Sequence, residues 1–148
     1  MNNALFMTGL AIFFHIWGGA TLGTAIAKST TRQFDSHVLG SMIGGTLLAF
    51  APLLIMGPTW VTLGQPLILA IEMLILVVAI GIPMFVPLQY RERFFGAKTY
   101  WVWLGMGLIL SSIYLFFQER DLAGCIGVST LLTGFYFLWR GVGLLRKP

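Results

Sequence analysis

Long apolar runs separated by short polar segments make up almost all of the 148-residue chain. A hydrocarbon core of about 30 Å takes about 20 helical residues to cross, and five of the runs reach or approach that length. The pattern predicts an all-α integral membrane protein, a bundle of about five transmembrane helices that forms a single domain over residues 1–148. The predicted spans are residues 4–27, 38–56, 66–88, 100–117 and 122–145.

The basic residues predict how the chain is oriented. Cytoplasmic connections of membrane proteins carry an excess of Lys and Arg. The basic residues gather in alternate segments, namely 28–37, 89–99 and the C-terminal end counted from Arg140, and only Arg120 falls on the other side. This separation predicts an external N-terminus and a cytoplasmic C-terminus, and adding or removing one span would destroy it.

Composition supports the same class. Hydrophobic residues make up 57% of the chain and charged residues 9%, whereas soluble domains carry about 25% charged residues. The formal charge of +4 comes from the short segments between apolar runs, so orientation in a membrane explains it without a nucleic-acid partner. We expect contact with membrane lipids and a location in a bacterial-type inner (plasma) membrane.

Motifs that would carry enzymatic chemistry are missing from the sequence. Cys125 is the single cysteine, which excludes a disulfide within the chain and a thiolate metal cluster. There is no HExxH, no GxSxG, no Walker-type loop and no Asp-rich pair. The sequence therefore predicts a protein that is not an enzyme, with no catalytic residue and no metal site.

Glu72 is the most costly residue to place, because it lies inside the apolar run of residues 66–88. An ionisable group in hydrocarbon costs a few kcal/mol, so it normally faces protein or water and marks a functional site. Heptad spacing puts Gln65 on the same helix face. We take Glu72 and Gln65 as candidates for proton or ion coupling. The alternatives are a bond to a neighbouring subunit, a wet external vestibule, or a bond to a Ser or Thr hydroxyl.

His15 is the second polar candidate and lies near the middle of the first span, on a face of small residues. A neutral imidazole beside a flat space is a good axial ligand, so haem or chlorin binding through His15 is one reading, and the cofactor is otherwise unknown. An interhelical hydrogen bond is the other reading. His37 lies at the edge of the second span, so we do not expect the two histidines of one chain to hold a haem between them; His15 would be a single axial ligand or share the haem with another chain. Whether His15 meets Glu72 is left open.

Small residues and prolines predict where helices pack and bend. In lipid, helices approach closely where small residues line their faces. The glycine rows are contact faces either between the helices of one chain or between chains of a tight oligomer or larger complex. Pro83 and Pro87 predict a kink in the third span, either a hinge or a static bend. The packing candidates are Gly19, Gly23, Gly40, Gly44, Gly127 and Gly134, with Gly141 seven residues further on.

Two functions fit these patterns. The first is a non-catalytic membrane subunit in a larger or homo-oligomeric assembly, such as a respiratory or photosynthetic electron-transfer complex, in contact with a lipid-like or ring cofactor. The second is a small oligomeric transporter or channel, coupled to protons or ions through Glu72. Five spans do not divide into two equal halves, so an inverted repeat within one chain is not supported. We rank the subunit first.

Overall fold

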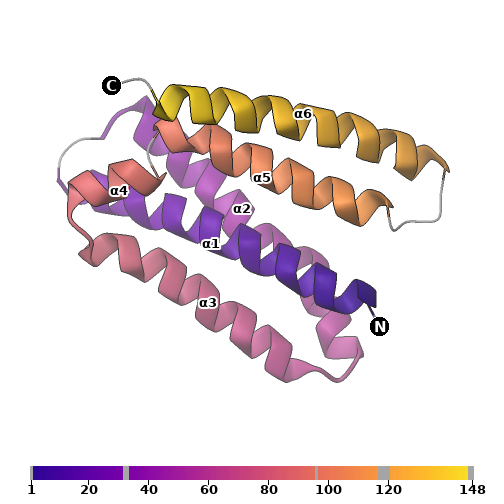
Figure 1. Cartoon of the computed structure of the whole chain (residues 1–148). Helices are drawn as coiled ribbons and strands as arrows, with labels where there is room; N and C mark the ends of the chain where they lie inside the picture. Colours follow the sequence, from indigo (N-terminus) through magenta and orange to yellow (C-terminus); the bar gives the residue numbers. More distant parts are fainter. Residues whose placement is uncertain (1, 32–33, 96, 117–120, 147–148) are drawn as a thin grey trace. The chain divides into compact units, whose positions relative to one another are not determined.

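Six α-helices make up nearly all of the computed structural model, which describes residues 2–31, 34–95, 97–116 and 121–146 (Figure 1). No strand occurs in these ranges. Arg32 and Lys147 lie outside them, and so do residues 118–120 of the connection predicted at 118–121 between the fourth and fifth spans, Arg120 included. The helices are α1 (Asn2–Thr30), α2 (Ser36–Thr62), α3 (Pro66–Phe85), α4 (Leu88–Phe95), α5 (Ala97–Phe116) and α6 (Asp121–Leu145).

Among the described residues, four stretches of helix are long and apolar enough to cross a membrane, judged by length and composition. They are Phe6–Thr30, Ser36–Thr62, Pro66–Phe85 and Ile126–Leu145. These helices support the predicted membrane class, and the all-helical fold is confirmed in the described residues. Helix α5 has 20 residues and overlaps the predicted span 100–117, but it is not one of these four. The fifth crossing therefore stays a prediction.

The turn between the second and third predicted spans comes later than the sequence pattern predicts. The pattern places it from Gly57 onward, but α2 continues through Pro58 to Thr62. Proline removes one backbone hydrogen bond and bends a helix, and in a membrane protein neighbouring groups can satisfy the freed carbonyl. The chain reverses instead at Gly64, whose φ of 67° costs a glycine nothing. Pro66 then begins α3.

Helix α3 ends before the predicted limit of residue 88. Val86 is extended, with φ −81° and ψ 137°, as expected for a residue that precedes a proline. The segment predicted as a connection, 89–99, contains most of the short helix α4. The guanidinium of Arg91 in α4 donates from Nε to the Val86 carbonyl, which ties α4 to the end of α3.

The helices group into two compact units, residues 11–91 and residues 1–10 together with 92–148. We call the first the α1–α3 unit and the second the α5–α6 unit. Such a grouping does not decide whether the chain is one domain, so the single domain stays a prediction.

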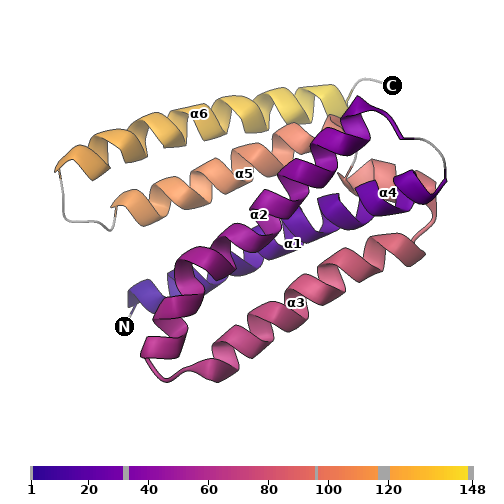
Figure 2. The same cartoon turned by 180° about the vertical axis from the view of Figure 1, so that it is seen from behind.

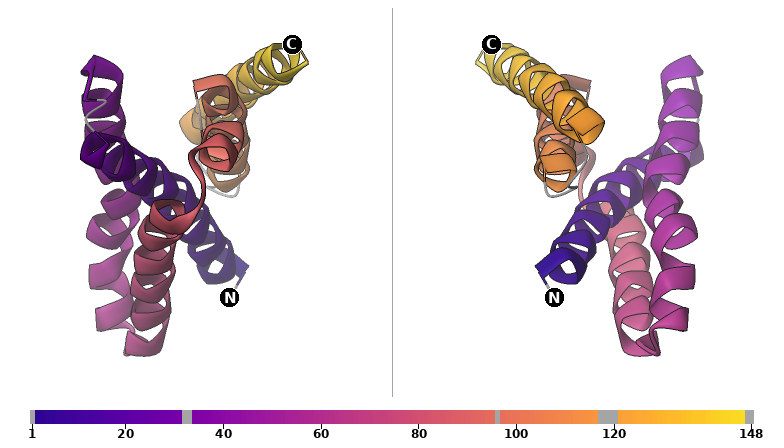
Figure 3. Two further views of the ribbon diagram at one scale, coloured as in Figure 1. Left: turned by 90° about the vertical axis from the view of Figure 1, so that its left-hand side faces the viewer. Right: turned by 90° about the vertical axis from the view of Figure 1, so that its right-hand side faces the viewer.

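Helix α1 packs against both other long helices of the α1–α3 unit through glycines. A Cβ atom built on Gly18 would lie 2.7 Å from the Cα of Ala49 in α2. One built on Gly19 would lie 2.9 Å from the Cβ of Ala79 in α3. Packed carbons stay about 3.5–4.0 Å apart, so only a hydrogen atom fits at either position. Helices α2 and α3 lie side by side and α1 crosses them (Figures 2 and 3).

In the α5–α6 unit, two antiparallel helices pack through glycine and aromatic side chains (Figure 1). A Cβ built on Gly105 of α5 would lie 2.7 Å from the carbonyl oxygen of Gly134 in α6. Trp101 stacks on Phe137 with ring centroids 5.1 Å apart. The guanidinium of Arg140 lies over the Trp101 ring, 4.8 Å from its centroid, so this cation is held against an aromatic face.

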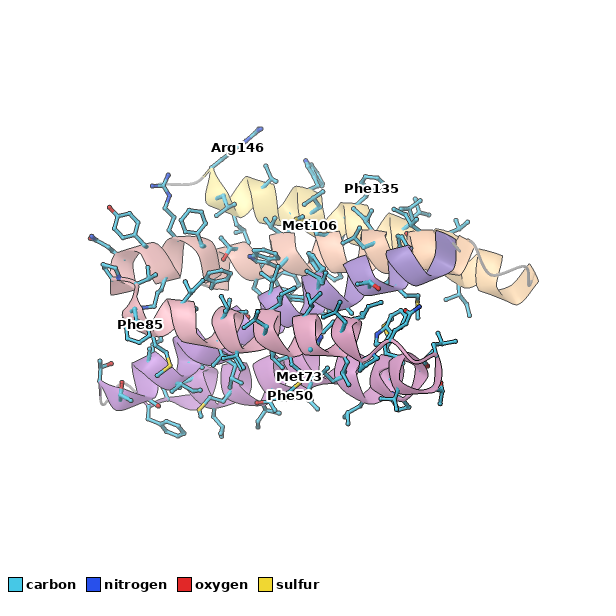
Figure 4. All side chains as sticks on the ribbon, turned by 90° about the horizontal axis from the view of Figure 1, so that it is seen from below. Phe50, Met73, Phe85, Met106, Phe135 and Arg146 are labelled. Atoms are coloured by element: carbon cyan, nitrogen blue, oxygen red, sulfur yellow. The ribbon has the colours of Figure 1, made fainter. Side chains whose placement is uncertain are left out.

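Large apolar side chains point away from the helices along much of the chain. Phe50, Met73, Phe85 and Phe135, which are labelled in Figure 4, are all exposed, and Phe85 is 90% exposed. A soluble monomer rarely exposes so much contiguous apolar surface. Lipid tails would cover such a surface at no cost, which agrees with the membrane class.

Candidate functional site

His15 is fully buried in the α1–α3 unit and bonds to the backbone of α2. Its Nδ1 lies 2.7 Å from the carbonyl oxygen of Ala49. A carbonyl only accepts, so Nδ1 carries the proton and donates it. In a neutral ring Nε2 is then a bare acceptor, and it is buried without a hydrogen-bond partner among the described residues.

The Ala49 carbonyl lies next to a backbone group that a proline leaves without its helical donor. Pro52 lies inside α2 and is buried. Because it has no N–H, it cannot donate to the carbonyl four residues earlier, which is that of Leu48. His15 bonds to the adjacent carbonyl, that of Ala49, so the imidazole joins α1 to α2 beside this position.

Glu72 is also fully buried, with 0% of its surface exposed. Its Oε1 accepts a hydrogen bond of 3.2 Å from the indole Nε1 of Trp60, which reaches across from α2. Its Oε2 is buried and has no partner among the described residues. The carboxyl therefore faces the interior of the unit. Its hydrogen-bond partner is the Trp60 indole and not a Ser or Thr hydroxyl, which was one of the alternatives predicted from the sequence.

Gln65 does not share this environment. It is exposed in the turn before α3, where its side chain makes no capping hydrogen bond. Its backbone N–H donates to the Trp60 carbonyl at 2.9 Å. The structure therefore brings Trp60, rather than Gln65, to the carboxyl of Glu72. The role of Gln65 in coupling stays a prediction.

The glycine candidates differ in what they contact. Gly19 and Gly23 face α3, where a Cβ on Gly23 would lie 3.2 Å from the Cα of Ile80. Gly134 and Gly141 face α5, and Gly127 is buried. By contrast, no described atom lies within 4 Å of a Cβ built on Gly40 or Gly44. The row 40–44 therefore packs no helix of its own unit.

The two prolines of the predicted hinge occupy different structures. Pro83 is buried inside α3, which continues to Phe85. Pro87 lies outside α3, and its carbonyl accepts from the backbone N–H of Tyr90 at the start of α4. The bend therefore coincides with the junction of α3 and α4. Movement there stays a prediction.

Trp60 and Ala49 are the site residues that the sequence reading missed. Trp60 precedes Glu72 by twelve residues, and the turn at Gly64 folds the two helices back on each other. Reading residues 57–72 as a helical hairpin would have pointed to this pair. Ala49 carries no such signal, because its backbone carbonyl and not its side chain is the partner.

Among the described residues, no group of three or more His, Cys, Asp or Glu could hold a metal ion. His15 and Glu72 are thus two separate buried polar groups of one three-helix unit, with no hydrogen bond directly between them. No protein-family model, curated protein or solved structure matches the chain.

Proposed function

We propose that the chain is a non-catalytic subunit of a larger or homo-oligomeric membrane assembly. It crosses the membrane five times, with α5 as the fourth crossing, an external N-terminus and a cytoplasmic C-terminus. A bacterial-type inner membrane fits the charge bias. The open glycine row of α2 carries this proposal.

That row has the form of a helix contact without a partner in its own unit. Gly40 and Gly44 lie one turn apart, and no described atom lies within 4 Å of a Cβ built on either. The side chains of Leu39, Ile43 and Leu47 beside them are exposed. Small residues four apart let two helix backbones approach closely, and larger side chains on either side then interlock. A partner helix from a second copy or from another subunit would complete the contact.

Native mass spectrometry of the protein extracted in mild detergent tests the assembly. We expect masses of several copies, or of the chain with other subunits. Gly44→Leu should dissociate a homo-oligomer, whereas Gly81→Leu, at an equally open glycine on α3, should not. A single chain as the only species for the unaltered protein would contradict the proposal.

A more specific form of this proposal, a subunit of an electron-transfer complex that contacts a ring cofactor, rests on His15. Axial histidines commonly donate Nδ1–H to a backbone carbonyl and bind metal through Nε2, which is the hydrogen-bond pattern of His15. Haem or chlorin contact is therefore a proposal for Nε2. A Soret or chlorin band in the purified protein that is lost in His15→Ala supports it, and a colourless preparation counts against it.

The second candidate function is proton- or ion-coupled transport. The unpartnered Oε2 of Glu72 favours it, because coupling acids lie inside membrane spans and face the protein interior. Glu72→Gln should abolish pH-driven flux in proteoliposomes. Asp35→Asn is a matched control, because it also replaces a carboxylate by an amide but keeps the helix cap. Equal flux in both variants would eliminate Glu72 as the coupling acid.

A further inference from the structure

The unpartnered atoms of His15 and Glu72 are chemically complementary. Nε2 of the neutral imidazole accepts a hydrogen bond, because Nδ1 already carries the ring proton. Oε1 of Glu72 accepts from Trp60, so a protonated carboxyl would donate from Oε2. One buried group thus lacks a donor and the other lacks an acceptor. Without a partner, Nε2 of His15 and Oε2 of Glu72 would each be a buried polar atom with no hydrogen bond, in a site closed to bulk water.

The helix register brings the two groups to similar depths. His15 precedes Gly19 by one turn, in the row 15, 19, 23 whose glycines contact α3. Glu72 precedes Ala79 by seven residues in the buried row 72, 76, 79, 83 of α3. Gly19 and Ala79 touch.

The offset along the helices follows from that contact. Helices α1 and α3 run in the same direction (Figure 1). At 1.5 Å per residue, His15 lies about 6 Å before the Gly19–Ala79 contact and Glu72 about 10.5 Å before it. The two residues differ by about 4.5 Å in depth. A single water with hydrogen bonds of about 2.8 Å on each side reaches across up to about 5.6 Å, which is more than this difference in depth.

No other titratable group competes for this place among the described buried residues. In the α1–α3 unit, the buried polar or charged residues are His15, Thr24 and Glu72. The hydroxyl of Thr24 donates to the Ala20 carbonyl, so it is already paired. From α2, only the Trp60 indole and the Ala49 carbonyl bond to the two groups. Arg91 lies beyond the far end of α3, and that end at Phe85 is about 20 Å from Glu72 along the helix axis.

We propose that His15 and Glu72 are linked through one bridging water and share a proton in the interior of the α1–α3 unit. The carboxyl donates to the water, and the water donates to Nε2. When the proton moves from Oε2 to Nε2 through the water, a carboxylate and an imidazolium form. The number of bound protons does not change, so the site relocates one proton without taking up net charge. The purpose of this proton exchange rests on the second candidate function, proton- or ion-coupled transport. The link itself is tested by NMR and infrared spectroscopy, which measure no flux.

Nitrogen-15 NMR of histidine-labelled protein in micelles tests the link at Nε2. The chain has two histidines, and the exposed His37 serves as the internal reference. We expect His15 with Nδ1 protonated and with an Nε2 resonance that is shifted by an accepted hydrogen bond. Glu72→Leu should move that resonance to the position of a free acceptor. Glu72→Gln should keep it bonded, because an amide N–H also donates.

A second measurement covers the case in which Glu72→Leu does not fold. The infrared C=O band of protonated Glu72, identified by its loss in Glu72→Gln, should shift in His15→Gln. Trp60→Phe is the matched control, because it removes only the bond to Oε1 and shows how far one lost bond moves the band.

Three results would overturn the inference. They are an Nε2 resonance that Glu72→Leu leaves unchanged, a tautomer with the proton on Nε2, and a visible band that assigns Nε2 to a ring cofactor. Loss of flux in Glu72→Gln, together with an Nε2 resonance that Glu72→Leu leaves unchanged, would support transport and reject the shared proton. The reverse pattern would support the shared proton and reject transport.

Discussion

Replacing Gly18 by alanine should separate α1 from α2, because the two backbones meet there without room for a methyl group. The added Cβ would lie 2.7 Å from the Cα of Ala49. An ordinary contact begins near 3.4 Å, so α1 must move by at least about 0.7 Å. Backbone atoms on a packed helix cannot rotate away as the end of a flexible side chain would. The whole helix contact must therefore open.

The displacement also reaches the hydrogen bond of His15. The bond from Nδ1 to the Ala49 carbonyl is 2.7 Å long and spans the same contact. Lengthened to about 3.4 Å, it leaves the normal range for such bonds. Overpacking costs about 1–3 kcal/mol, and a buried group left unpaired costs about 1–3 kcal/mol more. We expect Gly18→Ala to lose about 2–6 kcal/mol in all.

Thermal unfolding in detergent, followed by circular dichroism, measures this loss as a lower Tm. Gly40→Ala is the matched control, because no described atom lies within 4 Å of its added Cβ. The control should keep or slightly raise the Tm, since alanine favours helix over glycine by about 1 kcal/mol. Equal Tm values for the two variants would refute the packing argument.

Three further predictions concern other contacts. Asp35→Ala should lower the free energy of unfolding by about 1 kcal/mol, because the Asp35 carboxylate caps α2 by accepting from the Val38 N–H. Asp35→Ser, which keeps a capping oxygen, should retain most of this stability in the same unfolding assay. Trp60→Phe should leave the buried Oε1 of Glu72 without its hydrogen bond and destabilise the fold by about 1–3 kcal/mol. That cost should vanish in a Glu72→Leu background if the bond is its cause. Gly105→Leu should separate α5 from α6, because even a Cβ there would lie 2.5 Å from the Leu138 nitrogen; unaltered cross-linking between the two helices would speak against the contact.

Much of the fold follows from the sequence, because apolar length alone selects membrane-spanning helices. His15 and Glu72 stood out for the same reason, as polar groups within apolar runs. The helix ends were less predictable. Pro58 reads as a turn signal, yet α2 runs through it and the reversal waits for Gly64. Proline bends a helix at a cost that neighbouring contacts can offset, and those contacts are not visible in the pattern.

The rotation of each helix about its axis was the part that the sequence could not supply. Helices in lipid are apolar on all sides, so hydrophobic periodicity does not say which face turns inward. Gly44 and Gly45 are neighbours in the sequence and point about 100° apart. The structure turns Gly45 toward Leu22 and leaves Gly44 open. The same rotation decides that Glu72 meets Trp60, which no local pattern around either residue indicates.

The five-crossing arrangement, on which the depth and sidedness of Glu72 depend, is tested most directly by sided cysteine labelling in intact cells and inverted vesicles. Cys125 is first replaced by serine, and single cysteines are placed at three exposed positions, Phe34, Leu63 and Arg146. A membrane-impermeant thiol reagent should label position 63 from outside, and positions 34 and 146 only from the cytoplasmic side. Labelling of positions 34 and 63 from the same side would contradict the arrangement.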